Sequence, residues 1–245
     1  MTRALVTRPR AEAESLAAAL ARRGIDAVVE PLIEIAARAG PPLDLAGAQA
    51  ILCTSANGVR ALAAASAARD VTLLAVGDAT ARAARAAGFA DIASAGGDVD
   101  DLARLARERL HPAAGRLVHV TGSEVAGDLA GQLAASGFAV ERAVLYDAHA
   151  SEALSRDTAR LIAGGAFDLA LFFSPRSAAI FARLVVAAGI GDGLGATAAL
   201  SISAAADAAL AGLRFRARHV AAAPTQAALL ACLDATVRQP AEASS

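Results

Sequence analysis

The chain has 245 residues, a formal net charge of −1 and 23 basic residues, all of them arginine. Nucleic-acid binders usually carry a basic face, and a net charge of −1 argues against one. No apolar run approaches the roughly 18 residues of a membrane span. Cys53 and Cys232 lack the spacing of a zinc site or a disulfide framework. We therefore expect a cytoplasmic protein of one large or two smaller domains, with no metal and with neither nucleic acid nor membrane as a partner.

Apolar strands and helices alternate through the first half of the chain. Strands are predicted at residues 4–7, 25–30, 50–53 and 73–76, with a further extended segment at 31–35. The first helix has apolar residues at the i, i+3, i+4 and i+7 positions, and it ends at Gly24 after two arginines, as a left-handed cap requires. A later helix, at 79–87, is closed by Gly88 in the same way.

The same order of elements recurs in the second half. Strands are predicted at 116–120, 144–146, 168–173, 198–201 and 219–221, and the polar tail at 239–245 is predicted to be disordered. Equivalent punctuating residues recur at a nearly constant offset: Gly24 with Gly137, Ser55 with Ser174, and Gly88 with Gly212. We interpret this as an internal duplication.

Apolar strands alternating with helices predict an α/β fold with parallel sheets. One sheet of about ten strands is an alternative, but two smaller sheets fit the repeat better.

Small hydroxyl residues follow four of the predicted strands, at 7–9, 54–58, 121–123 and 174–177. In a parallel sheet these loops lie at the carboxyl ends of the strands, where ligands usually bind, and exposed helix N-termini there attract anions. The alternative interpretation is ordinary helix capping. Tyr146, the only tyrosine, lies at the end of a predicted strand; its hydroxyl could donate a proton, or its ring could pack at an interface.

Several motifs, in order and at suitable spacing, resemble the uroporphyrinogen-III synthase family. They are Thr7-Arg8-Pro9, Thr54-Ser55-Ala56-Asn57-Gly58-Val59-Arg60-Ala61, Ala75-Val76-Gly77-Asp78-Ala79-Thr80-Ala81, Tyr146, Phe173-Ser174-Pro175-Arg176-Ser177-Ala178 and Pro224-Thr225. Each motif alone is a weak signal. The ordered set covers nearly the whole chain, from about residue 3 to 235.

The resemblance implies two flavodoxin-like parallel-sheet lobes joined by a two-stranded linker. Residues 1–35 would join residues 150–245 in a discontinuous first lobe, and residues 39–145 would form the second lobe. The linker strands would lie at 31–38 and 144–149. Each lobe would then combine the front of one repeat with the back of the other.

The resemblance also implies a reaction. The family closes hydroxymethylbilane, a linear tetrapyrrole with many carboxylates, into uroporphyrinogen III with loss of water and inversion of the terminal pyrrole ring. The family needs neither a cofactor nor a metal. The expected protein is a cytoplasmic monomer, in transient contact with the enzyme that makes hydroxymethylbilane.

The matching positions define the expected site. Tyr146 corresponds to the linker tyrosine that is the usual candidate for the acid. The expected substrate-binding residues are Arg8, Ser55, Asn57, Gly77, Thr80, Ser123, Ser174, Arg176, Ser203 and Thr225. One segment departs from the pattern: at Ser203-Ala204, where many members carry two hydroxyl residues, only Ser203 remains.

Two other functions stay open on the sequence alone. One is a non-catalytic two-lobed module that binds a tetrapyrrole or another anion, for which the missing hydroxyl at Ala204 is the main argument. The other is a lyase or transferase that acts on a different polycarboxylate.

Overall fold

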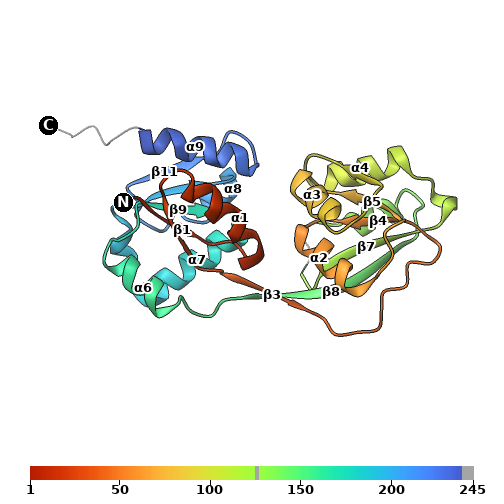
Figure 1. The fold of residues 1–245 in the computed structure, drawn as a ribbon, viewed down its shortest axis with the longest axis horizontal. Coiled ribbons are helices and arrows are strands. Elements are labelled where there is room, and N and C mark those ends of the chain that lie inside the picture. The colour runs from red at the N-terminus through yellow and green to blue at the C-terminus, as the bar shows by residue number, and fades with distance from the viewer. Residues whose placement is uncertain (125–126, 239–245) are drawn as a thin grey trace. The chain divides into compact units, whose positions relative to one another are not determined.

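The computed structural model describes residues 1–124 and 127–238 (Figure 1). By its internal contacts the chain divides into two compact units. Unit 1 comprises Met1–Glu34 and His149–Ser245, and unit 2 comprises Ile35–Ala148. The predicted tail at 239–245 lies outside the described residues. Within the described part, no helix has both the length and the apolar character needed to cross a membrane.

Unit 1 contains a five-stranded sheet in the order β11-β10-β9-β1-β2, with each of these neighbouring pairs parallel. Its strands are β1 (Arg3–Val6), β2 (Asp26–Val29), β9 (Leu169–Phe172), β10 (Ala198–Ser201) and β11 (Ala217–Val220). Its helices are α1 (Arg10–Ala21), α6 (Arg156–Ala163), α7 (Pro175–Ala188), α8 (Ala204–Ala208) and α9 (Gln226–Arg238), with a 3₁₀ turn at Gly191–Leu194.

Side chains of β1 alternate between two apolar layers, because successive residues of a strand point to opposite faces. Ala4 and Val6 pack with residues of α1 and α9, whereas Leu5 packs with Phe181 and other residues of α6 and α7. Both faces of the sheet are therefore covered by helices. This explains why the inner strands β1, β9 and β10 are nearly continuous apolar runs in the sequence.

Unit 2 contains a six-stranded sheet in the order β3-β8-β7-β4-β5-β6. The pairs β8-β7, β7-β4, β4-β5 and β5-β6 are parallel. The strands are β3 (Ile33–Ala37), β4 (Ala48–Cys53), β5 (Thr72–Ala75), β6 (Ile92–Ser94), β7 (Arg116–Gly122) and β8 (Val140–Ala150). The helices are α2 (Ala56–Ala65), α3 (Asp78–Ala86), α4 (Val99–Arg109) and α5 (Leu129–Ala134), with a 3₁₀ turn at Pro112–Ala114.

The inner strands β4 and β5 of unit 2 are also buried on both faces. Leu73 and Ala75 of β5 pack with residues of α2 and α3, and Leu74 between them packs with residues of α4 and α5. The predicted α/β class with parallel sheets is thus confirmed. Cys53, on β4, is fully buried in this sheet, and its burial raises the pKa of the thiol to about 12.

Helix ends were predicted well at three glycines. Gly24, Gly88 and Gly137 have φ angles of 71°, 91° and 84°, in the left-handed region that glycine occupies without steric cost. From the sequence, an alanine-rich helix after the strand at 198–201 was predicted to end at Gly212, and this prediction is wrong because the helix ends at Ala208. A series of turns joins these two residues, with Ala211 N–H donating to Ala208 O.

Candidate functional site

The predicted loops of unit 2 follow strands of its parallel sheet, at the carboxyl edge. Ser55 follows β4 and is the N-cap of α2; its Oγ accepts the N–H of Gly58 at 3.0 Å. Gly77 follows β5 and is the N-cap of α3, where no side chain caps the helix. Thr80, in the first turn of α3, is only 4% exposed. Two helix N-termini thus share this edge of the sheet, where backbone N–H groups favour anions.

Tyr146 lies on β8 at the same edge. Its ring is buried, and its hydroxyl lies 3.0 Å from Ser55 Oγ, so either atom could be the donor. Tyr146 O also accepts the N–H of Ser123, which follows β7, at 2.9 Å. The structure therefore brings three of the predicted residues, Tyr146, Ser55 and Ser123, into direct contact.

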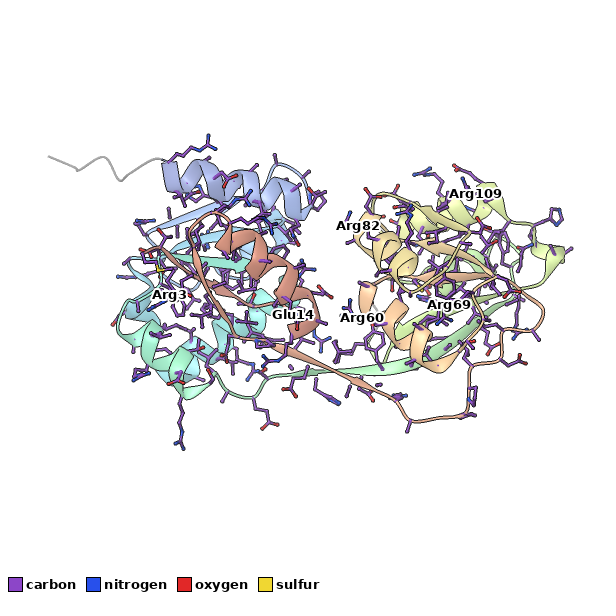
Figure 2. All side chains as sticks on the ribbon, viewed as in Figure 1. Arg3, Glu14, Arg60, Arg69, Arg82 and Arg109 are labelled. Atoms are coloured by element: carbon purple, nitrogen blue, oxygen red, sulfur yellow. The ribbon has the colours of Figure 1, made fainter. Side chains whose placement is uncertain are left out.

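Asn57 belongs to the first turn of α2. Its Oδ1 accepts a hydrogen bond from Nη2 of Arg60 at 2.5 Å, and Arg60 extends from α2 as Figure 2 shows. The amide and the guanidinium are separated by a single helical turn, which is the spacing at which two side chains of a helix meet. Asn57 therefore orients a cation beside the start of α2.

Predicted residues of unit 1 also follow its parallel strands. Ser174 follows β9 and caps α7, with Oγ accepting the N–H of Ser177 at 3.1 Å, and Pro175 begins the helix. Arg176, the next residue, is half-buried. Ser203 follows β10 and its Oγ accepts the N–H of Ala206 at 3.3 Å. Thr225 follows β11 and accepts the N–H of Ala228 at 3.1 Å. All three hydroxyl groups thus cap helices, as the capping interpretation required.

Arg8 is held by several contacts within unit 1. Its guanidinium donates to the carboxylate of Glu12 and to Oε1 of Gln226, the latter at 3.0 Å. The same group lies 4.3 Å from the ring centroid of Phe173. The charge of Arg8 is therefore offset by Glu12, and a carboxylate of a ligand would compete with that side chain.

In each unit, the predicted site residues thus lie at the carboxyl ends of the strands. Unit 2 holds Ser55, Asn57, Gly77, Thr80, Ser123 and Tyr146, and unit 1 holds Arg8, Ser174, Arg176, Ser203 and Thr225. Among the described residues, no group of three or more His, Cys, Asp or Glu side chains could hold a metal ion.

Two residues near Tyr146 were missed by sequence reasoning. Gly122 is the Cα partner of Tyr146 in the β7–β8 pairing. Arg142 donates from Nη2 to Gly122 O at 3.2 Å and to Ser123 O at 3.1 Å. The loop at 121–123 was singled out for its hydroxyl residues, and nothing in the sequence distinguished Gly122 from other glycines. Arg142 lies on a half-exposed strand with no periodic pattern to distinguish it.

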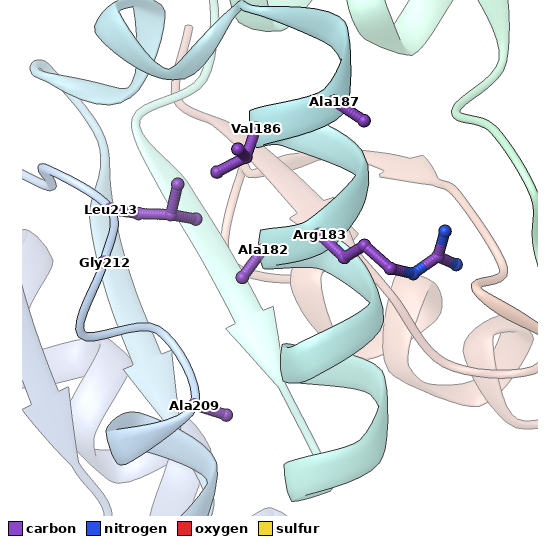
Figure 3. Close-up of a pocket in the computed structure, with 7 residues that line it drawn as sticks. All are labelled: Ala182, Arg183, Val186, Ala187, Ala209, Gly212 and Leu213. Carbon is purple, nitrogen blue, oxygen red and sulfur yellow. The ribbon is translucent and has the colours of Figure 1, made fainter.

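A pocket of about 480 Å³ in unit 1 has a different character (Figure 3). Ala182, Arg183 and Val186 of α7 line it together with Leu213, and most of this lining is apolar. No predicted site residue contributes to the lining. The pocket thus stands apart from the hydroxyl-bearing strand ends.

The fold and these strand ends define a class: an α/β protein of two parallel-sheet units, with helix N-termini and a phenol hydroxyl at the carboxyl ends of its strands. A family model described as uroporphyrinogen-III synthase HemD matches residues 14–231. The chain belongs to the uroporphyrinogen-III synthase family and is therefore an enzyme of haem biosynthesis. The resemblance of the sequence motifs to this family is confirmed.

Solved structures agree with this fold. Uroporphyrinogen-III synthetase from Helicobacter pylori is similar with a TM-score of 0.63 and 17% identity, over 96% of this chain and 100% of that one. A mutant uroporphyrinogen III synthase from Thermus thermophilus is similar with a TM-score of 0.54 and 16% identity, over 98% of this chain and 100% of that one. The comparison with curated proteins gave no match.

Proposed function

We propose that this chain converts hydroxymethylbilane into uroporphyrinogen III, as a hydro-lyase that inverts the terminal pyrrole ring while it closes the macrocycle. Membership of the family supports this reaction, since the family acts on a tetrapyrrole substrate. The observation that carries the assignment of roles is the Tyr146 hydroxyl, which lies 3.0 Å from Ser55 Oγ at the carboxyl edge of the sheet of unit 2.

In this scheme Tyr146 is the general acid. Its O–H bond breaks and the proton passes to the terminal hydroxyl of the substrate, which leaves as water with the electron pair of the C–O bond. The resulting azafulvene carbon attacks the substituted position of the last pyrrole, and the spiro intermediate reopens and recloses with that ring inverted. The carbon that finally closes the macrocycle loses its proton, and this proton restores the phenol.

Helix N-termini and arginines would hold the carboxylates of the substrate. Backbone N–H groups at a helix start favour anions, and a guanidinium binds a carboxylate through paired hydrogen bonds. The proposed substrate-binding residues are Arg8, Ser55, Asn57, Gly77, Thr80, Ser123, Ser174, Arg176, Ser203 and Thr225. Holding the two ends of a flexible chain together would supply a further part of the rate enhancement.

We further propose that the two units are flavodoxin-like lobes derived from an internal duplication. One lobe would be residues 1–35 with 150–245, the other 39–145, joined by linker strands at 31–38 and 144–149. The strand orders support this: numbered along the chain, the strands of unit 1 have the order 2-1-3-4-5, as in flavodoxin. The order β8-β7-β4-β5-β6 in unit 2 is the same once its front and back halves are exchanged.

We also propose that the enzyme works in the cytoplasm as a monomer and contacts the enzyme that supplies hydroxymethylbilane only transiently. Cys53 and Cys232 are both free thiols, which supports a reducing compartment. Sedimentation equilibrium should give the mass of one chain, 24.4 kDa. A mass of twice that value would contradict the monomer.

The reaction is tested by the isomer of the product. Purified protein supplied with freshly made hydroxymethylbilane should yield mainly the type III isomer, separable by chromatography from the type I isomer that forms spontaneously. Tyr146→Phe should lower kcat by about 100-fold, since removal of a general acid costs roughly that factor. The fold should be retained, because the ring stays and only one hydrogen bond at the surface of the core is lost.

Each outcome has a separate meaning. Type I product alone from the wild-type protein would contradict the proposed reaction. Normal turnover by Tyr146→Phe would remove the acid role from Tyr146 and leave the reaction in place. Tight binding of a tetrapyrrole without turnover would favour the non-catalytic binding module, in agreement with the alanines that follow Ser203 at the start of α8.

A further inference from the structure

The ring of Tyr146 rests directly on the backbone of Gly122. The pairing of β7 with β8 is irregular between Thr121 and Gly122, so that Thr121 faces Val144 whereas Gly122 faces Tyr146 and Leu145 is passed over. A Cβ built on Gly122 would lie 2.6 Å from Cε2 and 2.9 Å from Cζ of the tyrosine ring. Real Cβ atoms essentially never approach another atom this closely, so glycine is the residue that leaves room for the ring in this position.

The backbone below the ring is held in place by hydrogen bonds with residues of β8. Ser123 N–H donates to the carbonyl of Tyr146 at 2.9 Å. The guanidinium of Arg142 donates to the carbonyl oxygens of Gly122 and Ser123, at 3.2 and 3.1 Å. The surface on which the ring lies is therefore fixed by hydrogen bonds to the strand that carries the tyrosine.

Among the described residues, Ser55 is the hydrogen-bond partner of the Tyr146 hydroxyl, and either oxygen could be the donor. Ser55 Oγ accepts the N–H of Gly58 and keeps its own hydroxyl hydrogen, which can donate to Tyr146 Oη, 3.0 Å away. In this arrangement the phenol hydrogen remains available for a ligand. After the phenol has given its proton away, the Ser55 hydroxyl and the N-terminus of α2 would stabilise the oxygen anion.

We propose that Gly122 and Ser55 are positioning residues for Tyr146: Gly122 sets the height of the ring above the sheet, and Ser55 holds and polarises its hydroxyl toward the leaving group of the substrate. This inference rests on the proposed function, in which Tyr146 gives its proton to the departing hydroxyl. Ser55 keeps its own proton throughout, so the proton balance of the reaction is unchanged.

Gly122→Ala tests the first half of the proposal. The φ of Gly122 lies outside the left-handed region, so alanine can adopt the backbone without strain and the ring must move instead. We expect kcat to fall about 10- to 100-fold while KM changes by less than about 2-fold, because a small misplacement of a reacting group costs rate more than binding. Gly40→Ala is the matched control, since a Cβ at Gly40 would meet nothing within 4 Å.

A second set of variants separates the hydroxyl of Ser55 from its role as a cap. Ser55→Thr keeps both the cap and the donor and should retain most of the activity. Ser55→Asp keeps the cap but can only accept, and its charge opposes an anion on Tyr146 Oη. We expect Ser55→Asp to unfold at nearly the wild-type temperature and to lose about 100-fold in kcat.

Two readouts exclude a purely structural explanation. Tyr146 is the only tyrosine and the chain has no tryptophan, so tyrosine fluorescence and near-ultraviolet circular dichroism report on this ring. Gly122→Ala should change both signals, whereas Gly40→Ala should not. In a Tyr146→Phe background the hydroxyl is absent, and Gly122→Ala or Ser55→Asp should then cost less than about 2-fold further in kcat.

The outcomes distinguish this inference from the proposed function. Wild-type kcat in Gly122→Ala, or an equal loss in the wild-type and Tyr146→Phe backgrounds, would overturn the positioning role even if the wild-type protein makes the type III isomer. Full activity of Tyr146→Phe would overturn the acid role, and the positioning role with it. Production of type I isomer alone would overturn the reaction itself.

Discussion

His119 is a buried histidine on β7 whose two ring nitrogens have no hydrogen-bond partner within the described residues. Burial, with a smaller contribution from the positive charge of Arg142, lowers its pKa from 6.5 to about 4. The ring is therefore neutral in the folded protein at pH 7. It lies on β7, two residues before Thr121, and is 1% exposed.

Acidification should destabilise unit 2 through this residue. Between about pH 6.5 and pH 4 the imidazole of the unfolded chain binds a proton and that of the folded chain does not. The free energy of unfolding therefore decreases as the pH is lowered through this range. At the lower limit the loss is on the order of 3 kcal/mol. Urea unfolding followed by the fluorescence of Tyr146, which lies in unit 2, measures it.

A matched pair of variants isolates the contribution of the imidazole. His119→Leu removes the titrating group without creating an unpaired polar atom, so the stability at pH 7 should change little and the slope between pH 6.5 and 4 should flatten. His149→Leu, at an exposed position, should keep the wild-type slope. If the slope of His119→Leu equals that of the wild type, another group causes the acid sensitivity.

Helix N-termini are the elements on which the proposed substrate binding depends, and α7 offers a clean test. Ser174 caps this helix, and Asn or Asp in its place can cap it equally well, whereas Ser174→Ala should cost about 1 kcal/mol of stability. Only Ser174→Asp adds a negative charge where we propose that a substrate carboxylate binds. We therefore expect KM for hydroxymethylbilane to rise about 5-fold in Ser174→Asp and to stay near wild type in Ser174→Asn. Equal KM values would argue against an anion site at this helix.

Elements with a strong sequence pattern were the ones that could be predicted. Strands buried on both faces, such as β5 and β9, are continuous apolar runs, and glycine-capped helices end where the pattern stops. The short strand β6 and the helix α6 were missed, because β6 has only three residues and α6 has a mainly charged or polar first turn. The strand β8 extends from Val140 to Ala150, beyond the predicted 144–146, since its polar residues hid the pattern.

The same distinction holds for the candidate site. Hydroxyl residues after strands predicted the helix caps at Ser55 and Ser174, because capping is a local property of a few neighbouring residues. The contact of Tyr146 with Gly122 could not be predicted. It depends on an irregularity in the β7–β8 pairing, and the register of two strands is set by packing across the sheet rather than by local sequence.

At the scale of the whole molecule, the two units differ in how the chain supplies them. Unit 2 is one continuous stretch and has its own apolar layers on both faces of its sheet. We predict that residues 33–150, which include all of β3 and β8, fold cooperatively when expressed alone. Urea unfolding by circular dichroism should show one transition, and Leu52→Ala, at a fully buried position, should lower its stability by about 3 kcal/mol.

Unit 1 should behave in the opposite way, because its sheet is built from both ends of the chain. The strand β1 lies between β2 and β9, so residues 149–238 alone would leave the edge of β9 unpaired. They would also lose Leu16, Leu20 and the rest of α1 from the apolar layer against α9. We predict that this fragment does not unfold cooperatively, and that a chain in which residues 1–34 are joined to 149–238 by a short flexible linker does. A cooperative transition in residues 149–238 alone would contradict the discontinuous unit.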